Sequence, residues 1–433
     1  MRSVARSAVE RVLPERLGRP FRWLVTSSWI SNIGDGVALA AGPLLVASET
    51  RSPLLVALAA VMQFLPRLLF GLVAGVVADR VDRRHLIAVA NACRVVVLAA
   101  LVTTLVTGQV SIAVVLGAVF LLGVGETFAD TTTATLLPML VAKADLGVAN
   151  ARLLAGIITL DQLVGPPLGA LLFGLGRQWP FVTQAVCVAL SLLLVLHLQL
   201  PAHGRRAAGA TDATGGRGST LVAEIREGLG WVRRHAAVRT LVLTILIFNV
   251  TFGASWSVLV LYAQERLGLG NLGFGLLTSA LACGGILGTV SYGWLERHVS
   301  LAWIMRGGLV VETLTHLVLA LTTVPAVALA TMFVFGAHAF IWGTTSTAVR
   351  QRAVPMPMQG RVQSVYMLGV TGGFVLGSLL GGVVAHAYGV TAPFWVGFVG
   401  SAAFLALLWH QLLHVAHADE EALARAGTDE PAS

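Results

Sequence analysis

The stretch Gly75-Val76-Val77-Ala78-Asp79-Arg80-Val81-Asp82-Arg83-Arg84 decides the fold, because it places five charges within six residues between two long apolar segments. A helix that crosses a lipid bilayer needs about 20 mostly apolar residues. Residues 54–78 and 86–107 both meet that requirement. The charged stretch therefore predicts a tight loop that joins two antiparallel membrane-spanning helices.

The composition is that of a membrane protein. Hydrophobic residues make up 56% of the 433 residues and charged residues 12%, whereas a soluble domain carries about 25% charged residues. We therefore expect an all-α membrane protein and exclude the soluble fold classes. The net charge of +8 does not indicate nucleic-acid binding, because the arginines lie in short loops between apolar segments, where membrane topology explains them.

Twelve apolar segments predict twelve transmembrane helices. They cover residues 23–47, 54–78, 86–107, 111–137, 148–173, 180–200, 238–262, 272–295, 301–322, 325–349, 362–387 and 392–414. The longest break, 201–220, is rich in Gly, Ala, Arg and Thr, which is typical of a flexible linker, and it separates six spans from six. One constant shift in numbering sets Gly75 on Gly288 and Gly169 on Gly382. We therefore predict two pseudo-symmetric six-helix halves.

The predicted domain organisation follows from these spans. It consists of a cytoplasmic N-terminal segment (1–22), an N-terminal half (23–200), a cytoplasmic linker with an amphipathic helix (201–237), a C-terminal half (238–414) and a cytoplasmic tail (415–433). Most of the 29 basic residues lie on the side that holds the N-terminus. Because loops rich in Lys and Arg stay in the cytoplasm, we expect a multi-pass protein of the cell (inner) membrane with both termini cytoplasmic.

Ionisable residues in the predicted spans of the first half form a group at one depth. Asp130 lies one turn nearer the cytoplasm than the other five residues. Those five lie near mid-membrane and are Asp35, Arg67, Arg94, Glu126 and Asp161. Charges in the hydrocarbon core are costly and mark functional sites by default. Four acids against two arginines leave two acids without a basic partner, and such a carboxyl can bind and release protons. A static ion-pair network that fixes helix packing is the alternative.

The second half holds fewer polar candidates. Asn249, Glu312, His338 and Trp342 are the candidates for a substrate cavity. A histidine at mid-depth, such as His338, titrates near neutral pH, although a lone histidine in a helix is more often simply hydrogen-bonded. The aromatic residues in the same spans could line a cavity for apolar ligands or face lipid.

The charged stretch resembles, residue for residue, the Gly-x-x-x-Asp-Arg-x-Gly-Arg-Arg loop of the major facilitator superfamily, except that Asp82 replaces the inner Gly. A basic loop that merely obeys the positive-inside rule would explain the arginines but not the spacing from Gly75 to Asp79. The resemblance implies a conformational-switch loop, formed by Gly75, Asp79, Arg80, Arg83 and Arg84.

The fifth span holds Gly165-Pro166-Pro167-Leu168-Gly169, which resembles the Gly-Pro-x-x-Gly-Gly end of the antiporter motif of this superfamily. The resemblance makes Gly165, Pro166 and Gly169 an antiporter-like motif, in which glycines allow close helix contact and proline weakens the helix. Asp161 stands where the family has Gly, and Ala170 replaces the final Gly, so symport stays open beside antiport.

Further stretches are similar to the bacterial efflux branch that contains the enterobactin exporter and the macrolide efflux proteins. They are Gly34-Asp35-Gly36, the run from Gly125 to Asp130, and Gly360-Arg361-Val362. This resemblance implies proton-driven export, a contact of Asp79 with the start of the eleventh span, and an ion pair of Arg83 with Asp130. It leaves Asp35 and Glu126 as the proton-coupling candidates, with Arg67, Arg94, Asp130 and Asp161 as the remaining charge network.

The function predicted from all this is proton-coupled export of small amphipathic molecules, either drug-like compounds or a secondary metabolite such as a siderophore. The alternatives are a lipid or lysolipid translocator and a non-transporting sensor or scaffold. No nucleotide-binding loop, catalytic arrangement or metal-ligand pattern occurs, and all three cysteines fall within spans. We therefore expect no enzymatic activity, cofactor or metal, and a monomer whose partners are a small-molecule substrate, protons and the lipid bilayer.

Overall fold

The computed structural model describes residues 14–198, 221–355, 358–409 and 411, and these residues form helices and no strand. In chain order the helices before the linker are η1 (Glu15–Leu17), α2 (Arg19–Glu49), α3 (Pro53–Arg80), α4 (Arg83–Val106), α5 (Ile112–Leu140), η2 (Lys143–Asp145), α6 (Leu146–Gly156), η3 (Ile157–Val164), α7 (Gly165–Leu175) and α8 (Trp179–Leu196). After it follow α10 (Leu221–Arg234), α11 (Ala236–Trp256), α12 (Leu259–Leu261), η4 (Tyr262–Arg266), α13 (Asn271–His298), α14 (Leu301–Leu321), α15 (Pro325–Ala353), α16 (Gln359–Tyr388) and α17 (Ala392–Leu408).

Each predicted span corresponds to a helix or to a run of helices. Among the described residues, eleven helical segments are long and apolar enough to cross a bilayer, and α17 is a shorter apolar helix. The fifth span is continuous from η2 to α7 but contains the π-helical segment η3. The seventh span ends six residues earlier than predicted, at Trp256. The first 13 residues, the predicted linker between 201 and 220 and the whole predicted tail (415–433) lie outside the described residues.

The charged stretch is more helical than predicted. α3 continues through Asp79 and Arg80, and α4 begins at Arg83, so only Val81 and Asp82 connect them. Asp82 is the N-cap of α4, and its carboxylate accepts a hydrogen bond from the backbone N–H of His85 at 3.1 Å. Aspartate is a preferred N-cap residue. The one residue that departs from the superfamily loop therefore starts the next helix.

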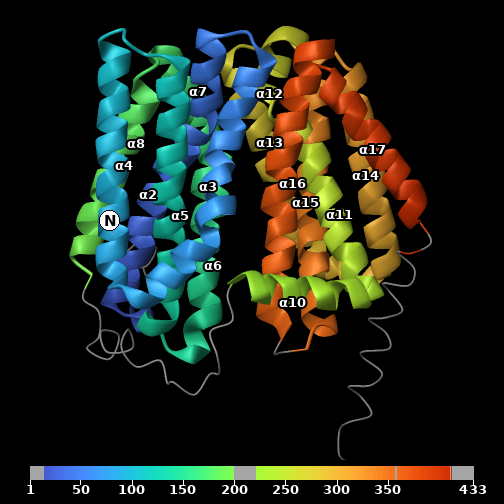
Figure 1. The fold of residues 1–433 in the computed structure, drawn as a ribbon, viewed down its shortest axis with the longest axis horizontal. Coiled ribbons are helices and arrows are strands. Elements are labelled where there is room, and N and C mark those ends of the chain that lie inside the picture. Colours follow the sequence, from blue (N-terminus) through green and yellow to red (C-terminus); the bar gives the residue numbers. More distant parts are fainter. Residues whose placement is uncertain (1–13, 199–220, 356–357, 410, 412–433) are drawn as a thin grey trace, which may run out of the picture. The chain divides into compact units, whose positions relative to one another are not determined.

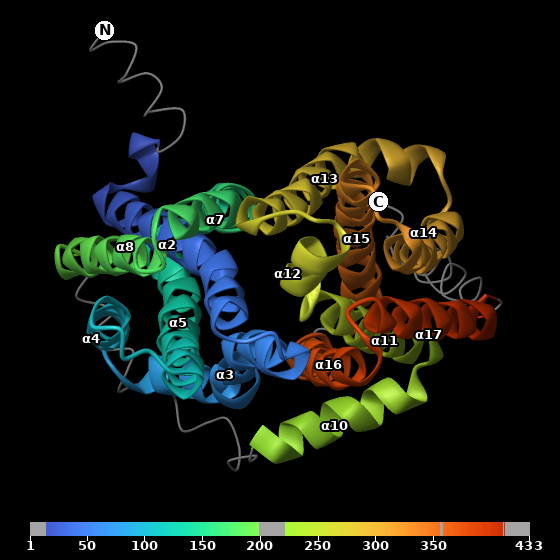
Figure 2. The same cartoon turned by 90° about the horizontal axis from the view of Figure 1, so that it is seen from above.

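Two compact units make up the chain. One contains residues 1–50 and 62–216, and the other contains residues 51–61 and 217–433, so the first turns of α3 group with the second unit. Within the first unit, α2 packs against α7 and α8 (Figure 2). Within the second unit, α11 packs against α16, and α13 against α15 (Figure 1).

Glycines allow these helices to approach backbone to backbone. A Cβ atom on Gly169 of α7 would lie 2.2 Å from the carbonyl oxygen of Val37 in α2. In the second unit, a Cβ atom on Gly284 of α13 would lie 1.8 Å from the carbonyl oxygen of Phe333 in α15. Neither position has room for any side chain, which is the close contact expected of small residues between membrane helices.

The amphipathic helix of the predicted linker is α10, which ends at Arg234 and is separated from α11 by His235. It lies across the ends of α11 and α16 in Figure 1. Glu227 of α10 accepts a hydrogen bond from Arg361 of α16 at 2.7 Å, and the backbone of Arg361 touches Gly228. The helix is thus attached to the start of α16.

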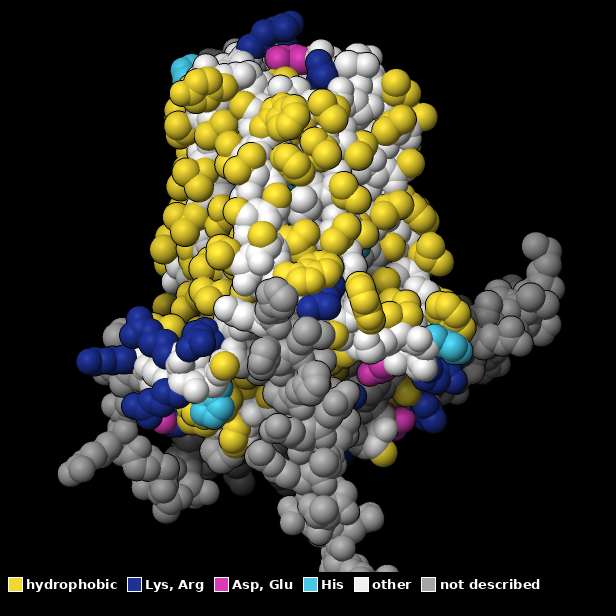
Figure 3. All heavy atoms as spheres, turned by 90° about the vertical axis from the view of Figure 1, so that its right-hand side faces the viewer, with side chains coloured by type: hydrophobic (Ala, Val, Ile, Leu, Met, Phe, Trp, Pro, Cys, Tyr) yellow, Lys and Arg dark blue, Asp and Glu magenta, His cyan; other side chains and the backbone are white. Residues whose placement is uncertain are grey.

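The surface composition fits a bilayer. On the face of the molecule shown in Figure 3, apolar side chains cover the middle, while basic, acidic and histidine side chains gather at the two ends. Large exposed apolar residues are numerous, and examples are Val290, Leu175 and Val399. A soluble protein rarely exposes continuous apolar surface of this extent.

Candidate functional site

A buried ion pair between Asp35 of α2 and Arg94 of α4 lies at the centre of the first unit. The side chain of Arg94 is 1% exposed and that of Asp35 is 10% exposed. Asp35 accepts two further hydrogen bonds, from the hydroxyl of Ser31 at 3.0 Å and from the amide of Gln184 in α8 at 3.3 Å. The Asp35 carboxylate therefore has three donors from three helices.

The ion pair continues into a network of neutral polar side chains. Arg94 also donates to Ser31 at 3.2 Å and to the amide oxygen of Asn91 at 3.3 Å. The amide nitrogen of Asn91 donates to Ser191 of α8 at 3.3 Å, and the hydroxyls of Ser191 and Ser27 are 2.8 Å apart. Buried polar networks of this kind are costly unless each member is paired. The network joins α2, α4 and α8.

A second charge cluster lies on α3 and α5. One guanidinium nitrogen of Arg67 is 3.2 Å from Oε1 of Glu126 and 3.4 Å from Oδ2 of Asp130. All three side chains are partly exposed, in contrast to the buried Asp35–Arg94 pair. A polar hollow beside the Ser191 network is lined in part by Asp130. Arg67 is therefore the counter-ion of two carboxylates, and one of these, that of Asp130, borders the polar network.

Asp161 is the acid of the group that has no ion pair among the described residues. It lies within electrostatic range of Arg67 and sits in η3, the π-helical segment that directly precedes Pro166. Proline lacks the N–H that would close an α-helical hydrogen bond to the preceding turn, which explains the wider winding there. π-Helical turns occur frequently at functional sites.

The glycines beside Asp35 leave no open space next to its carboxylate, because neighbouring helices pack against them. A Cβ atom on Gly36 would lie 2.4 Å from the backbone oxygen of Asp161, and one on Gly34 would lie 2.9 Å from Cβ of Cys187. The neighbouring helices fill this space, because the close packing of α2 against η3 and α8 needs it. Gly165 likewise contacts the backbone of Gly36, so the antiporter-like motif packs beside Asp35.

The prediction of an ion pair between Arg83 and Asp130 is wrong, because both residues have other partners. Arg83 donates to Asp79 at 3.0 Å, to the hydroxyl of Thr135 at 3.1 Å and to the sulfur of Met139 at 3.2 Å. Arg83 begins α4 and reaches only the last turns of α5, whereas Asp130 lies deeper and pairs with Arg67.

The other members of the switch loop have separate environments. Arg84 donates to the backbone oxygen of Leu196, which ties the start of α4 to the end of α8. A Cβ atom on Gly75 would meet nothing within 4 Å, so packing within the described residues does not require a glycine there. The contact of Asp79 with the start of the eleventh span stays a prediction.

The four cavity candidates of the second half are all buried. Glu312 is 1% exposed and accepts a hydrogen bond from the hydroxyl of Thr251 at 2.9 Å, with no ion pair among the described residues. Asn249 donates to the backbone oxygen of Ile245 in its own helix. The rings of His338 and Trp342 contact edge to face, with centroids 6.3 Å apart.

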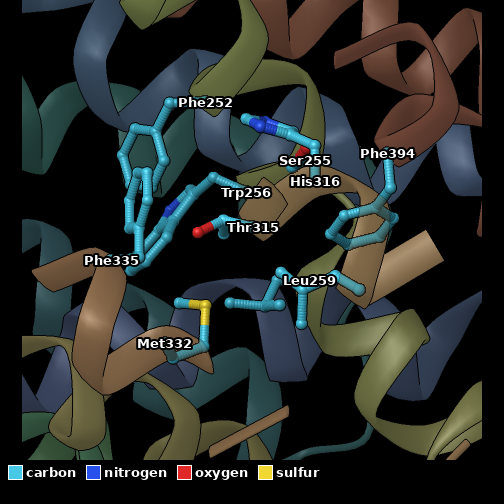
Figure 4. A pocket seen from close by; sticks show the side chains of 10 residues that line it. Phe252, Ser255, Trp256, Leu259, Thr315, His316, Met332, Phe335 and Phe394 are labelled. Carbon is cyan, nitrogen blue, oxygen red and sulfur yellow. The ribbon is translucent and has the colours of Figure 1, made fainter. Parts of the chain in front are cut away.

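A small apolar cavity with about 20 Å³ of free space lies in the second unit, and His316, one turn along α14 from Glu312, lines it. Phe252, Trp256 and Phe335 form one side of it, and Phe394 lies on the other (Figure 4). The four residues predicted to line a substrate cavity are not among those that line this one.

Comparison with known proteins decides the family. The sequence model of a major facilitator superfamily family described as "Transmembrane secretion effector" matches residues 17–432. The chain belongs to this family. The match confirms the predicted membership of the superfamily, to which the loop at Gly75 pointed.

Curated relatives of the chain are transporters. It is 28% identical over 389 residues to the multidrug efflux pump Tap of Mycolicibacterium fortuitum, covering 87% of this chain and 91% of the relative. It is 27% identical over 283 residues to YuxJ, an uncharacterized MFS-type transporter of Bacillus subtilis, covering 64% and 69%.

Solved structures confirm the predicted fold class of the chain. An inward-facing bacterial homolog of the human lysosomal transporter Spinster superposes with a TM-score of 0.68 at 14% identity, covering 95% of this chain and 98% of that one. The nucleoside transporter NupG superposes with a TM-score of 0.68 at 12% identity, covering 92% and 99%. At such identities the likeness concerns the fold alone.

Sequence reasoning missed the uncharged polar residues of the charge site in the first unit. Gln184, Asn91 and Ser191 complete the hydrogen bonding of Asp35 and Arg94. Their spacing was informative, because Gln184 and Ser191 are seven residues apart and so share one face of a helix. Polar residues at helical spacing inside an apolar segment identify an inward face.

Proposed function

We propose that the chain exports small amphipathic molecules from the cytoplasm in exchange for protons. The observation that carries the proposal is the excess of acids in the first unit, where Arg67 and Arg94 pair with three carboxylates and a fourth, that of Asp161, lies near Arg67 without an ion pair in the described residues. Curated relatives named multidrug efflux pumps support outward transport of drug-like compounds. A secondary metabolite such as a siderophore is the other substrate class of the proposal.

The Asp35–Arg94 pair would couple protonation to helix movement. A proton on Asp35 removes the charge that attracts Arg94, while Ser31 and Asn91 still hold the guanidinium. Since Asp35 lies on α2 and Arg94 on α4, loss of their attraction loosens the contact between these two helices. Buried charge pairs of this kind have large coupling energies because the local dielectric is low.

Glu126 supplies the second proton site in this proposal. Arg67 can balance only one of the two carboxylates that it contacts. The other is free to carry a proton or to meet a cationic substrate, and the partial exposure of all three side chains makes both accessible. Asp161, without an ion pair of its own in the described residues, adds a third carboxyl to the same electrostatic group.

The proposed setting is the inner membrane, with both termini in the cytoplasm and the chain acting as a monomer. The basic residues of the loops support this orientation. Asp79 and the arginines of the switch loop would then lie on the cytoplasmic side, where the Asp79–Arg83 pair links the end of α3 to the start of α4.

Asp35→Asn and Glu126→Gln are each expected to reduce proton-coupled export to the level of protein-free liposomes, because an amide cannot exchange a proton. Proteoliposomes loaded with a pH-sensitive dye would be given ethidium, a macrolide or a catechol siderophore, and proton movement recorded. Glu296→Gln is the matched control, since Glu296 pairs with Arg352 at 3.6 Å in an exposed position. Transport by both variants at the wild-type rate would contradict the assignment of the proton carriers.

A further inference from the structure

The polar hollow of the first unit contains a buried hydrogen-bond donor that has no acceptor. The hollow lies among α2, α4, α5 and α8, has about 20 Å³ of free space, and eight of its eleven lining residues are polar. Asn32 of α2 lines it and is 9% exposed, yet its side-chain nitrogen makes no hydrogen bond within the described residues. Buried donors without an acceptor are rare and costly. The hollow therefore has both the room and the unpaired polar group that a small bound molecule requires.

The size and charge of the hollow identify the molecule that fits it. A water molecule needs about 10–15 Å³ of such space, so one water fits and a larger solute does not. The carboxylate of Asp130 lines the hollow and would repel an anion. Arg94 donates to Ser31 and Asn91 in its wall and would repel a cation, and a metal cation cannot accept a hydrogen bond from Asn32. Water is neutral and can both accept and donate hydrogen bonds.

The polar hollow lies between an accessible carboxylate and a buried one. The side chain of Asp130 is 58% exposed. Ser31, on another wall of the hollow, donates to Asp35 at 3.0 Å, and the Asp35 side chain is 10% exposed. A water in the hollow would therefore complete a chain of oxygen atoms from the buried carboxylate through the Ser31 hydroxyl to the accessible carboxylate.

From these observations we propose that the polar hollow binds one water molecule, which passes protons between Asp35 and Asp130. Asn32 is a positioning residue, because its amide nitrogen donates to a lone pair of the water and fixes its orientation. The proposal rests on the proposed export function, in which Asp130 lies nearer the cytoplasm than Asp35. It adds to that function the route by which the proton of Asp35 leaves towards the cytoplasm.

The transfer needs no other reactant. The carboxyl proton of Asp35 moves to the hydroxyl oxygen of Ser31, whose own proton moves to the water. A proton of the water then moves to the carboxylate of Asp130. The hydroxyl and the water each gain and lose one proton, so the net change is the transfer of one proton from Asp35 to Asp130.

X-ray footprinting tests the water site directly, because hydroxyl radicals formed from a bound water oxidise the side chains beside it. Leu24 and Ile87 line the hollow and are each 2% exposed, so bulk solvent does not reach them. We expect both to be oxidised in the purified wild-type protein and both to be spared in Asn32→Leu, whose larger apolar side chain displaces water. Leu44 of α2, 1% exposed and outside the hollow, is the internal control. Unmodified Leu24 and Ile87 in the wild type would overturn the water site.

Transport kinetics test the role of Asn32 in the relay. In the proteoliposome assay, Asn32→Leu is expected to lower the maximal rate of proton movement about tenfold, because the proton loses its hydrogen-bonded path. The substrate concentration at half-maximal rate is expected to stay unchanged, and Asn32→Ser, which keeps a donor, is expected to retain most of the rate. Asn150→Leu is the matched control, since Asn150 is exposed and donates within its own helix. A wild-type rate in Asn32→Leu would overturn the relay.

A second variant tests the relay should Asn32→Leu not fold. Thr133→Val removes a hydroxyl from the α5 wall of the hollow without changing the shape of the side chain. It is expected to lower the maximal rate, although less than Asn32→Leu does. Size-exclusion profiles identical to wild type show that the variants are folded. A wild-type rate in both folded Thr133→Val and Asn32→Ser, together with unmodified Leu24, would overturn the relay.

Failure of the relay and failure of the export function give different results. Loss of proton movement in Asp35→Asn, with a wild-type rate in Asn32→Leu, would support export and overturn the relay. Oxidised Leu24 and Ile87 without proton movement for any compound would support the water site and contradict proton-coupled export. Proton movement is expected to persist when N-methylglucamine replaces sodium and potassium, and its loss in that buffer would indicate a metal cation in the hollow and overturn the proposal.

Discussion

Arg94→Met is expected to cost the protein about 3–5 kcal/mol of unfolding free energy, the effect of removing one partner from a buried ion pair. Methionine fills the volume of the arginine stem but leaves the Asp35 carboxylate buried without its cation. Ser31 and Asn91 lose a donor in the same step. Thermal unfolding in detergent, followed by size-exclusion chromatography, measures the loss.

The double variant Arg94→Met, Asp35→Asn is expected to recover most of that stability, because no unpaired charge remains buried. Arg177→Met is the control, since Arg177 forms an exposed ion pair with Glu49 and exposed pairs contribute about 0–1 kcal/mol. A double variant as unstable as Arg94→Met alone would show that the arginine acts through packing and not through its pairing with Asp35.

Gly169→Ala is expected to lower stability by about 1–3 kcal/mol, the usual cost of overpacking, and to impair transport. Its new methyl group would lie 2.2 Å from the carbonyl oxygen of Val37, so α2 and α7 would have to separate. That separation would also move Asp35 away from Arg94, because Asp35 is carried by α2.

Gly174→Ala on the same helix is the matched control. A Cβ atom there meets nothing within 4 Å, so we expect a change of less than about 0.5 kcal/mol. If both alanine variants unfold at the wild-type temperature and transport at the wild-type rate, the close contact between α2 and α7 has no part in the mechanism.

The helices could be predicted from the sequence because the bilayer imposes a length and a composition on each span. The predicted segments 54–78 and 301–322 correspond to α3 and α14 within a few residues. The π-helical winding of η3 was not predicted. Pro166 and Pro167 indicated that the helix is weakened at this point. Whether the helix kinks or adopts the wider π-helical winding there also depends on the backbone of Gly36, which packs against Gly165.

The membership of the charge site could be predicted, but its pairing could not. The number of acids and arginines at one depth followed from counting residues along each span. Which arginine meets which acid depends on helix rotation, which a sequence of mostly apolar residues does not fix. Arg83 illustrates this, because the residues of α5 that it contacts, Thr135 and Met139, lie beyond the expected partner Asp130 towards the end of that helix.

The cavity of the second unit was beyond prediction for another reason. Its walls come from α11, α12, α14, α15 and α17, and an aromatic residue in an apolar span looks the same whether it faces lipid or a cavity. Only the packing distinguishes Trp256, which lines the cavity, from Trp303, which is exposed.

The free space around an added Cβ atom differs between glycines, and this difference indicates where spectroscopic labels can be attached. Gly117 on α5 and Gly174 on α7 in the first unit, and Gly293 on α13 and Gly307 on α14 in the second, have nothing within 4 Å of an added Cβ atom. Nitroxides attached at such places leave the helix contacts intact. Distances within each pair would then record whether a unit stays rigid through the transport cycle, without the distortion that a label at Gly169 or Gly284 would cause.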